Sequence, residues 1–127
     1  MRNLDDAAVE ELARYFGALA TPIRLKILNA LMEGERNVGE LTALTGCTQA
    51  NMSKHLAVLA QNGMVGKTPS GTSVYYRIVD PRVHKLCALV CDNLGRRYAR
   101  QADRGRSFFA AANTIGRARP ARWRLLK

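Results

Sequence analysis

The sequence predicts a mainly α-helical domain that carries one β-hairpin, and three observations support this prediction. Apolar residues recur at helical spacing in about five segments between residues 5 and 95. Residues 46–48 separate two of these segments by a turn so short that the two helices must cross steeply. Residues 72–79 then alternate apolar and polar side chains after a turn at residues 69–71. A steep helix pair followed by a hairpin is the arrangement of a winged helix-turn-helix.

Each of the first two helices has a recognisable start. Residues 5–19 form an amphipathic helix with acidic side chains in its first turns, where the helix dipole favours them. Thr21 can cap the next helix and Pro22 suits its first position, so this helix runs from there to near Gly34. The apolar positions at helical spacing in the first helix are Val9, Leu12, Phe16 and Leu19. The second helix is expected to bury Ile23, Ile27, Leu28 and Leu31.

Caps and a glycine mark the remaining helices. Asn37 can cap a third helix, Thr48 a fourth and Asp80–Pro81 a fifth, and Gly63 stands where a glycine ends the fourth. A strand of the hairpin is expected to begin at residues 64–67. The core face expected of the fourth helix is Met52, Leu56 and Leu59. Apolar residues also recur at helical spacing in the third helix (Val38, Leu41 and Leu44) and form a stripe along the fifth (Val83, Leu86, Cys87, Val90 and Leu94).

Charge divides the chain into two parts. The 127 residues carry a net charge of +10, but residues 1–95 hold ten Lys/Arg against nine Asp/Glu, whereas residues 96–127 hold ten against one. The part up to residue 95 is therefore nearly neutral. We predict a domain over residues 1–100 and a basic extension over residues 101–127, helical near 100–112 and then disordered. A basic tail can bind DNA, RNA or anionic lipid, so charge alone assigns no partner.

The bulk sequence indicates a cytoplasmic protein. No run of about 18 apolar residues is present to span a membrane, and the N-terminus lacks the apolar core of a secretion signal. Three cysteines are an odd number, which favours reduced thiols over a disulfide framework.

The start of the fourth helix is rich in side chains that can read DNA bases. Gln and Asn form paired hydrogen bonds with adenine, Lys prefers guanine or phosphate, and Ser and Thr adapt to either. The hairpin can add contacts to the minor groove or its phosphates. The predicted DNA-binding residues are Thr48, Gln49, Asn51, Ser53, Lys54, His55, Lys67, Ser70 and Arg77. A merely solvated polar face is the alternative for either element.

The cysteines allow either a sensing role or a packing role. Cys87 and Cys91 are one helical turn apart and could ligate a thiophilic ion such as As(III), Sb(III) or Cu(I), or could simply fill the core. Cys47 stands in the turn just before the fourth helix, and the N-terminus of a helix favours thiolate chemistry with metals or oxidants. An enzyme using Cys47 as nucleophile is not expected, because no base is placed beside it by the sequence, and no catalytic residue is assigned.

Three segments, in order and at matching spacing, resemble the ArsR/SmtB family of bacterial repressors. Residues 20–28 (ATPIRLKIL) resemble the stretch that opens its second helix, and residues 38–56 resemble its helix-turn-helix, with the signature Ser-Lys-His-Leu at residues 53–56. Residues 63–65 and 74–78 resemble the strands of its wing. The resemblance implies a homodimer, paired through its first and last helices, that represses transcription from palindromic double-stranded operator DNA and releases it on meeting an inducer.

The resemblance does not identify the inducer. The zinc site found on the last helix of related sensors is degenerate here, with Arg82, Asn93 and Arg96 at or near the ligand positions, and no arsenic-type cysteine cluster is present near the second or third helix. Two alternatives stay open beside a cysteine-sensing repressor. One is a regulator that is constitutive or responds without its cysteines, and the other is an RNA-binding or nucleic-acid-binding module driven by the basic tail.

Overall fold

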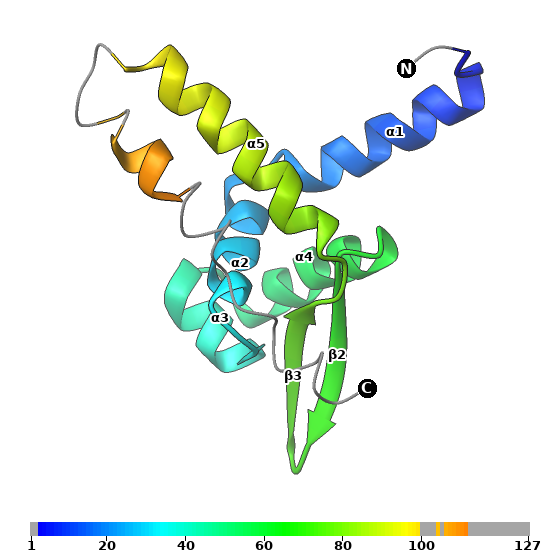
Figure 1. The fold of residues 1–127 in the computed structure, drawn as a ribbon. Helices are drawn as coiled ribbons and strands as arrows, with labels where there is room; N and C mark the ends of the chain where they lie inside the picture. The colour runs from blue at the N-terminus through cyan, green and yellow to red at the C-terminus, as the bar shows by residue number, and fades with distance from the viewer. Residues whose placement is uncertain (1–2, 100–103, 105, 112–127) are drawn as a thin grey trace.

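A computed structural model describes residues 3–99, 104 and 106–111 of the chain, and it has the predicted winged helix-turn-helix fold (Figure 1). Helices α2, α3 and α4 form a compact body, the hairpin extends from one end of it, and α1 and α5 diverge as two arms at the other end. The elements are α1 (Asp6–Leu19), α2 (Pro22–Met32), β1 (Arg36–Asn37), α3 (Val38–Thr45), α4 (Gln49–Gln61), β2 (Val65–Ser70), β3 (Ser73–Ile78) and α5 (Arg82–Arg97).

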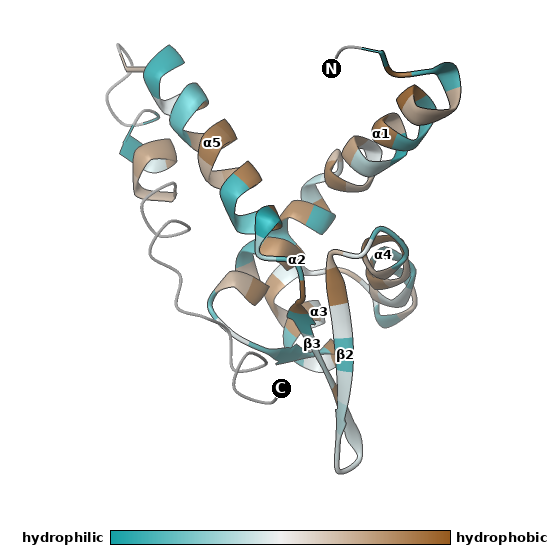
Figure 2. Ribbon diagram, turned by 45° about the vertical axis from the view of Figure 1, so that its right-hand side comes forward, coloured by the Kyte–Doolittle hydropathy of each residue, from teal (hydrophilic) through white to brown (hydrophobic). Residues whose placement is uncertain are grey.

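One cluster of apolar side chains holds the body together, and it draws on nearly every element. Hydrophobic (brown) and hydrophilic (teal) residues are mixed along the helices in Figure 2, as expected of helices that bury one face. Burial of each apolar side chain contributes about 1.5–3 kcal/mol, so this cluster supplies the main driving force for folding. Its fully buried members are Ile27, Leu28, Leu31, Leu41, Met52, Leu56, Leu59, Met64, Ile78 and Val83.

The predicted caps of the central helices are confirmed. The Thr21 hydroxyl accepts a bond from the Arg24 amide, and the Thr48 hydroxyl accepts one from the Asn51 amide. Asn37 and Glu40 form a reciprocal capping box, in which each side chain accepts a bond from the other residue's backbone amide. These bonds satisfy amides that a helix start leaves without partners, and so they fix where α2, α3 and α4 begin.

The turn between α3 and α4 depends on Gly46. This residue ends α3 in the left-handed region, with φ 72°, and its amide donates to the Thr42 carbonyl. A side chain at that φ costs about 1–2 kcal/mol, which is why glycine suits the position. The chain then turns through Cys47 directly into the Thr48 cap, so α4 sets off across α3 rather than alongside it.

The sheet differs from the prediction in two respects. It has three antiparallel strands in the order β1-β3-β2, because the short β1 pairs Arg36 with Tyr76 and Asn37 with Tyr75, a strand the sequence analysis did not predict. Pro69 and Ser70 belong to β2 rather than to the turn, and Pro69 pairs with Val74. The prediction was wrong because proline is compatible with an edge strand, and β2 lies at the edge.

Two smaller points also differ from the sequence pattern. Leu44 follows the apolar period of α3, yet its side chain stays 59% exposed. Pro81, not Asp80, is the N-cap of α5, and no side chain caps that helix through a hydrogen bond. The Asp80 carboxylate instead accepts bonds from the Arg82 amide and guanidinium, which lowers the pKa of Asp80.

The two arms carry apolar side chains that the chain itself does not cover. Val9 and Phe16 on α1 and Leu89 and Val90 on α5 are each about half or more exposed. Beyond α5, residues 106–111 are helical, in agreement with the extension predicted near 100–112, and the rest of the predicted disordered tail lies outside the described residues. The Phe109 ring lies against Gly95, and Phe108 stacks on Tyr98 with ring centroids 6.0 Å apart.

Gly46→Ala should lower the free energy of unfolding by about 1–2 kcal/mol, because alanine is strained at positive φ. Gly17→Ala is the matched control: neither glycine has an atom within 4 Å of an added Cβ, but Gly17 lies within α1 and should gain about 0.5–1 kcal/mol. Urea unfolding at one fixed protein concentration measures both changes. Equal effects of the two substitutions would contradict the role given to Gly46.

Candidate nucleic-acid interface

The first turns of α4 present a row of polar side chains to solvent. Gln49, Asn51, Ser53 and Lys54 are all exposed, while Met52 and Leu56 of the same helix are buried in the core. This division follows from helical spacing, since a helix that buries one face must display the other. A DNA major groove is wide enough to admit an α-helix.

Two hydroxyls of the predicted set are already engaged within α4. Thr48 Oγ1 accepts from the Asn51 amide at 3.2 Å, and Ser53 Oγ donates to the Gln49 carbonyl at 3.2 Å. Both residues remain exposed. These two bonds stabilise the start of α4. Gln49, Asn51 and Lys54 are the longer side chains that extend from this face.

His55 lies deeper than the others and has a partner from α2. It is half-buried, and its Nδ1 lies 3.3 Å from Nη1 of Arg24. Sequence reasoning did not assign Arg24 a role, although the residue stands inside the 20–28 segment. Nothing in the spacing shows that a residue 31 positions away will meet His55.

The wing places its predicted residues differently. Lys67 and Ser70 on β2 are exposed, but Arg77 on β3 is half-buried and its Nη1 donates to the Thr68 hydroxyl across the hairpin. Arg77 therefore braces the two strands, and Lys67 is the cation that extends from the hairpin into solvent.

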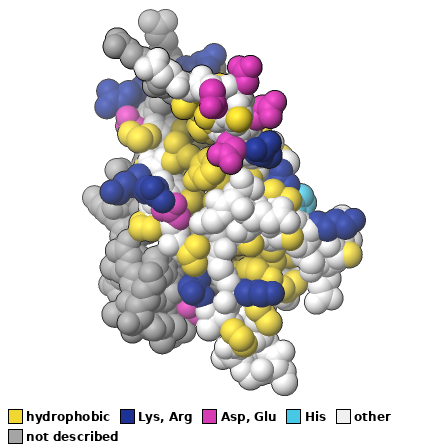
Figure 3. All heavy atoms as spheres, turned by 90° about the vertical axis from the view of Figure 1, so that its right-hand side faces the viewer, with side chains coloured by type: hydrophobic (Ala, Val, Ile, Leu, Met, Phe, Trp, Pro, Cys, Tyr) yellow, Lys and Arg dark blue, Asp and Glu magenta, His cyan; other side chains and the backbone are white. Residues whose placement is uncertain are grey.

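Charge is distributed unevenly over the face that includes α1 and α4. Acidic side chains gather toward its upper end, around α1, and Lys and Arg side chains are spread from the upper end to the lower (Figure 3). The described residues therefore form no broad basic field on this face, in agreement with the nearly balanced composition of residues 1–95. Side chains that fit a groove would have to provide most of its selectivity.

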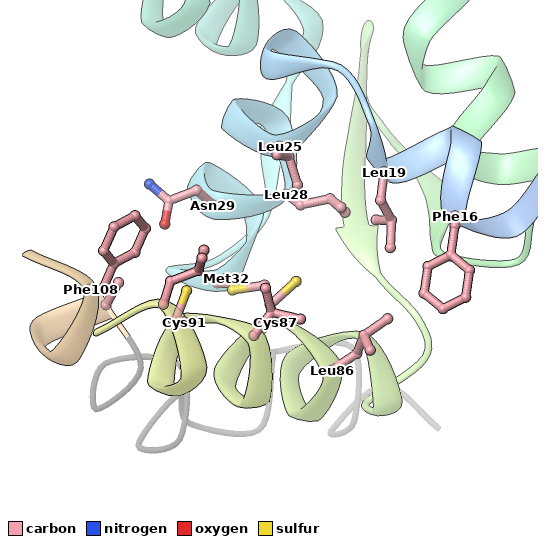
Figure 4. Close-up of a pocket in the computed structure, with 13 residues that line it drawn as sticks. Phe16, Leu19, Leu25, Leu28, Asn29, Met32, Leu86, Cys87, Cys91 and Phe108 are labelled. Atoms are coloured by element: carbon pink, nitrogen blue, oxygen red, sulfur yellow. The ribbon is translucent and has the colours of Figure 1, made fainter. Parts of the chain in front are cut away.

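A second feature is an apolar pocket of about 390 Å³ between α1, α2, α5 and residues 108–111. Phe16 and Leu19 stand at one end and Phe108 at the other, with Cys87 and Cys91 projecting from α5 toward α2 (Figure 4). Asn29 supplies the amide of an otherwise apolar lining. The predicted neighbours Cys87 and Cys91 thus share one pocket.

The environment of the pocket keeps both thiols protonated. Burial raises the pKa of Cys87, and the nearby Cys91 raises it further; burial also raises the pKa of Cys91. All three cysteines are free thiols, and Cys47 packs against the core cluster beside the turn. Within the described residues, no three His, Cys, Asp or Glu side chains come together as a metal site.

Comparison with known proteins identifies the fold's family. The family profile described as "Bacterial regulatory protein, arsR family" matches residues 21–67, the segment from the cap of α2 to β2. The solution structure of the homodimeric winged helix-turn-helix DNA-binding domain of Mb0332 from Mycobacterium bovis, a possible ArsR-family transcriptional regulator, superposes with a TM-score of 0.61. It is 38% identical, over 71% of this chain and 86% of that one.

The chain belongs to the ArsR family. A crystal structure of Rv0081 from Mycobacterium tuberculosis is also similar, with a TM-score of 0.72 and 32% identity over 76% of this chain and 98% of that one. A probable mercury resistance operon repressor of Streptomyces lividans is 40% identical over 77 residues, 61% of this chain and 62% of that protein, so the match spans less than two thirds of the relative.

Membership makes this chain a winged-helix DNA-binding transcription regulator. In helix-turn-helix proteins the second helix of the motif lies in the major groove, and α4 is the second helix of the motif in this chain. Among the described residues of this ArsR-family protein, no helix is both long and apolar enough to cross a membrane.

Asn51→Ala should reduce preference for the operator over a scrambled duplex by about 1–3 kcal/mol, the worth of one paired contact to a base. Asn51 is exposed, so folding should be unaffected. Fluorescence anisotropy with an operator selected from random DNA by the parent protein measures the change. Gln61→Ala, equally exposed at the far end of α4, is the control and should bind like the parent. Equal loss in both variants would show that the α4 start does not read bases.

Proposed function

We propose that this ArsR-family protein is a homodimeric repressor that binds a palindromic operator in the cytoplasm and releases it when an inducer binds. The observation that carries the proposal is the pairing of two surfaces on one chain. A polar reading face lies at the start of α4, and uncovered apolar side chains lie on the arms α1 and α5. The homodimeric state of the Mycobacterium bovis relative supports a homodimer, and the uncovered apolar side chains support pairing through the arms.

Repression then follows from geometry. A two-fold pair presents two α4 helices, which must lie about one DNA turn apart to enter successive major grooves. An inducer that favours a different separation of the arms removes that match. Reversing the balance between the two shapes from 1:99 to 99:1 requires about 5.5 kcal/mol of differential affinity, so the inducer must contact the elements that move.

The proposed inducer acts on Cys87 and Cys91. Two thiols one helical turn apart suit a thiophilic species such as As(III), Sb(III) or Cu(I), and the adjoining pocket of about 390 Å³ leaves room for further substituents. A third ligand would come from the inducer itself or from the second protomer. Cys47, beside the reading helix, is the proposed site for an oxidant, and no catalytic role is proposed for it.

A second candidate is regulation without the cysteines. Cys47 and Cys87 both pack against the hydrophobic core, as expected of small apolar residues. In that case the repressor is constitutive or responds to another signal, and the thiols contribute only packing.

The function is tested by operator selection combined with analytical ultracentrifugation. The parent protein should enrich a palindromic sequence from random DNA and sediment on it as two chains. A parallel selection from single-stranded RNA is the comparison. Enrichment of the RNA, or binding to DNA without sequence preference, would support instead the alternative of a module driven by its basic tail.

Cys87→Ser and Cys91→Ser should each abolish release of the operator by As(III) or Sb(III), while Cys47→Ser should affect only release by peroxide. Because the pKa of both pocket thiols is raised, they are protonated at neutral pH, so metalloid-driven release should quicken as pH rises toward the alkaline range. Stopped-flow anisotropy measures the rates. If all three serine variants respond like the parent, the cysteines do not sense.

Neutralising the tail should weaken binding without changing its selectivity. Replacing Arg117, Arg119, Arg122 and Arg124 by Gln leaves Phe108 and Phe109 in place against α5. Each phosphate contact that the substitutions remove should reduce the slope of log affinity against log salt by about 0.9. Salt titrations on operator and scrambled DNA provide the measurement, and weaker binding confined to the operator would contradict a sequence-independent role.

A further inference from the structure

Arg24 joins two helices that are far apart in the sequence. Its Nε donates to the Ala18 carbonyl at 2.7 Å and its Nη2 to the Gly17 carbonyl at 3.1 Å, both at the end of α1. Its Nη1 lies 3.3 Å from Nδ1 of His55 on α4. One side chain of α2 therefore bonds to the arm and to the reading helix together.

These contacts determine which nitrogen of the neutral imidazole carries the proton. A guanidinium carries only donors, so Nδ1 of His55 must accept, and an accepting Nδ1 carries no proton. The neutral ring then has its proton on Nε2. His55 is thus held as the Nε2–H tautomer, with that nitrogen as its donor.

The end of α1 is what aims the guanidinium. Carbonyl groups at a helix C-terminus lack the usual partner four residues on and attract cations, and the last turn of α1 contains no basic residue of its own. The Gly17 carbonyl also accepts from the Ala20 amide at 3.1 Å, and a carbonyl oxygen has a second lone pair for the guanidinium. Arg24 supplies that cation from α2. Because the guanidinium is a rigid planar fork, two bonds to α1 fix the direction of the third toward α4.

We propose that Arg24 is a positioning residue for DNA binding: it holds His55 so that the Nε2–H of the imidazole donates to a backbone phosphate. Because Arg24 also bonds to the last turn of α1, the phosphate contact depends on the position of that turn. The inference rests on the proposed function, since it assumes that α4 enters a groove. Arg24 itself does not touch DNA in this account, because each of its three nitrogens bonds inside the protein.

The arrangement gives the arms a route to the reading helix. If an inducer shifts the end of α1, the two carbonyls move and the guanidinium turns with them. His55 then loses the bond that selects its tautomer, and the ring can also populate the Nδ1–H form. A phosphate contact weakens although no residue at the DNA surface has been displaced directly.

The tautomer can be measured without DNA. In the full-length protein labelled with ¹⁵N-histidine, two-bond ¹H–¹⁵N correlation spectra distinguish the two neutral forms, and His84→Gln assigns the signals of the two histidines. The parent should show His55 in the Nε2–H form alone. An Nδ1–H form in the parent overturns the proposal, whatever the variants do.

Arg24→Met retains the aliphatic stem and removes the donors. His55 should then show a mixture of tautomers, and affinity for the selected operator should fall about tenfold, the size expected for one hydrogen bond to a charged phosphate. Lys26→Met is the matched control, because it removes the same charge from an exposed neighbour on α2, and it should leave the tautomer unchanged.

His55→Ala should also cost about tenfold, and combining it with Arg24→Met should cost little more, because both substitutions remove the same contact. Additive losses, or equal losses in Arg24→Met and Lys26→Met, would overturn the positioning role while the parent still binds its operator. Failure of the parent to select any operator would instead refute the proposed function. If Arg24→Met does not fold, the tautomer of the parent and the affinity of His55→Ala still decide.

Discussion

The left-handed turn at Gly46 sets the angle at which α4 crosses α3, and the surfaces of the molecule follow from that angle. A helix running alongside α3 would bury its first turns against the body. Crossing it instead lets Met52, Leu56 and Leu59 fill the core while Gln49, Asn51 and Lys54 stand clear. Core packing and the reading face are therefore two sides of one helix, and a change that tilts α4 alters both.

The arms meet this body at few points, and Arg24 is one of them. α1 and α5 diverge from α2, with their apolar faces uncovered, so a second protomer can pack there without disturbing the core. The pocket that contains Cys87 and Cys91 lies where both arms join α2. A molecule entering it would press on the arms rather than on α4. The Arg24 guanidinium is bonded to the end of α1 and to His55, so a displacement of α1 could be transmitted through it to α4.

Local rules predicted much of this fold, and contacts between distant segments explain what they missed. The caps at Thr21, Asn37 and Thr48 depend on residues three positions apart, which a sequence displays directly. The pairing of β1 with β3 and the bond from Arg24 to His55 join positions that no local pattern connects. Leu44 also shows that helical spacing predicts which residues share a helix face but not whether another element covers them, since this side chain follows the period and is still exposed. The nine DNA-binding residues predicted from sequence remain predictions, although Arg77 and Thr48 have acquired structural partners.

The central claim is that two copies of α4 enter one duplex, related by a two-fold axis. Hydroxyl-radical footprinting of the parent protein on its selected operator tests this most directly. The account predicts two protected patches with mirror symmetry, their centres about 10–10.5 base pairs apart or a multiple of that spacing. A single patch without internal symmetry, occupied at saturation by one chain, would contradict it.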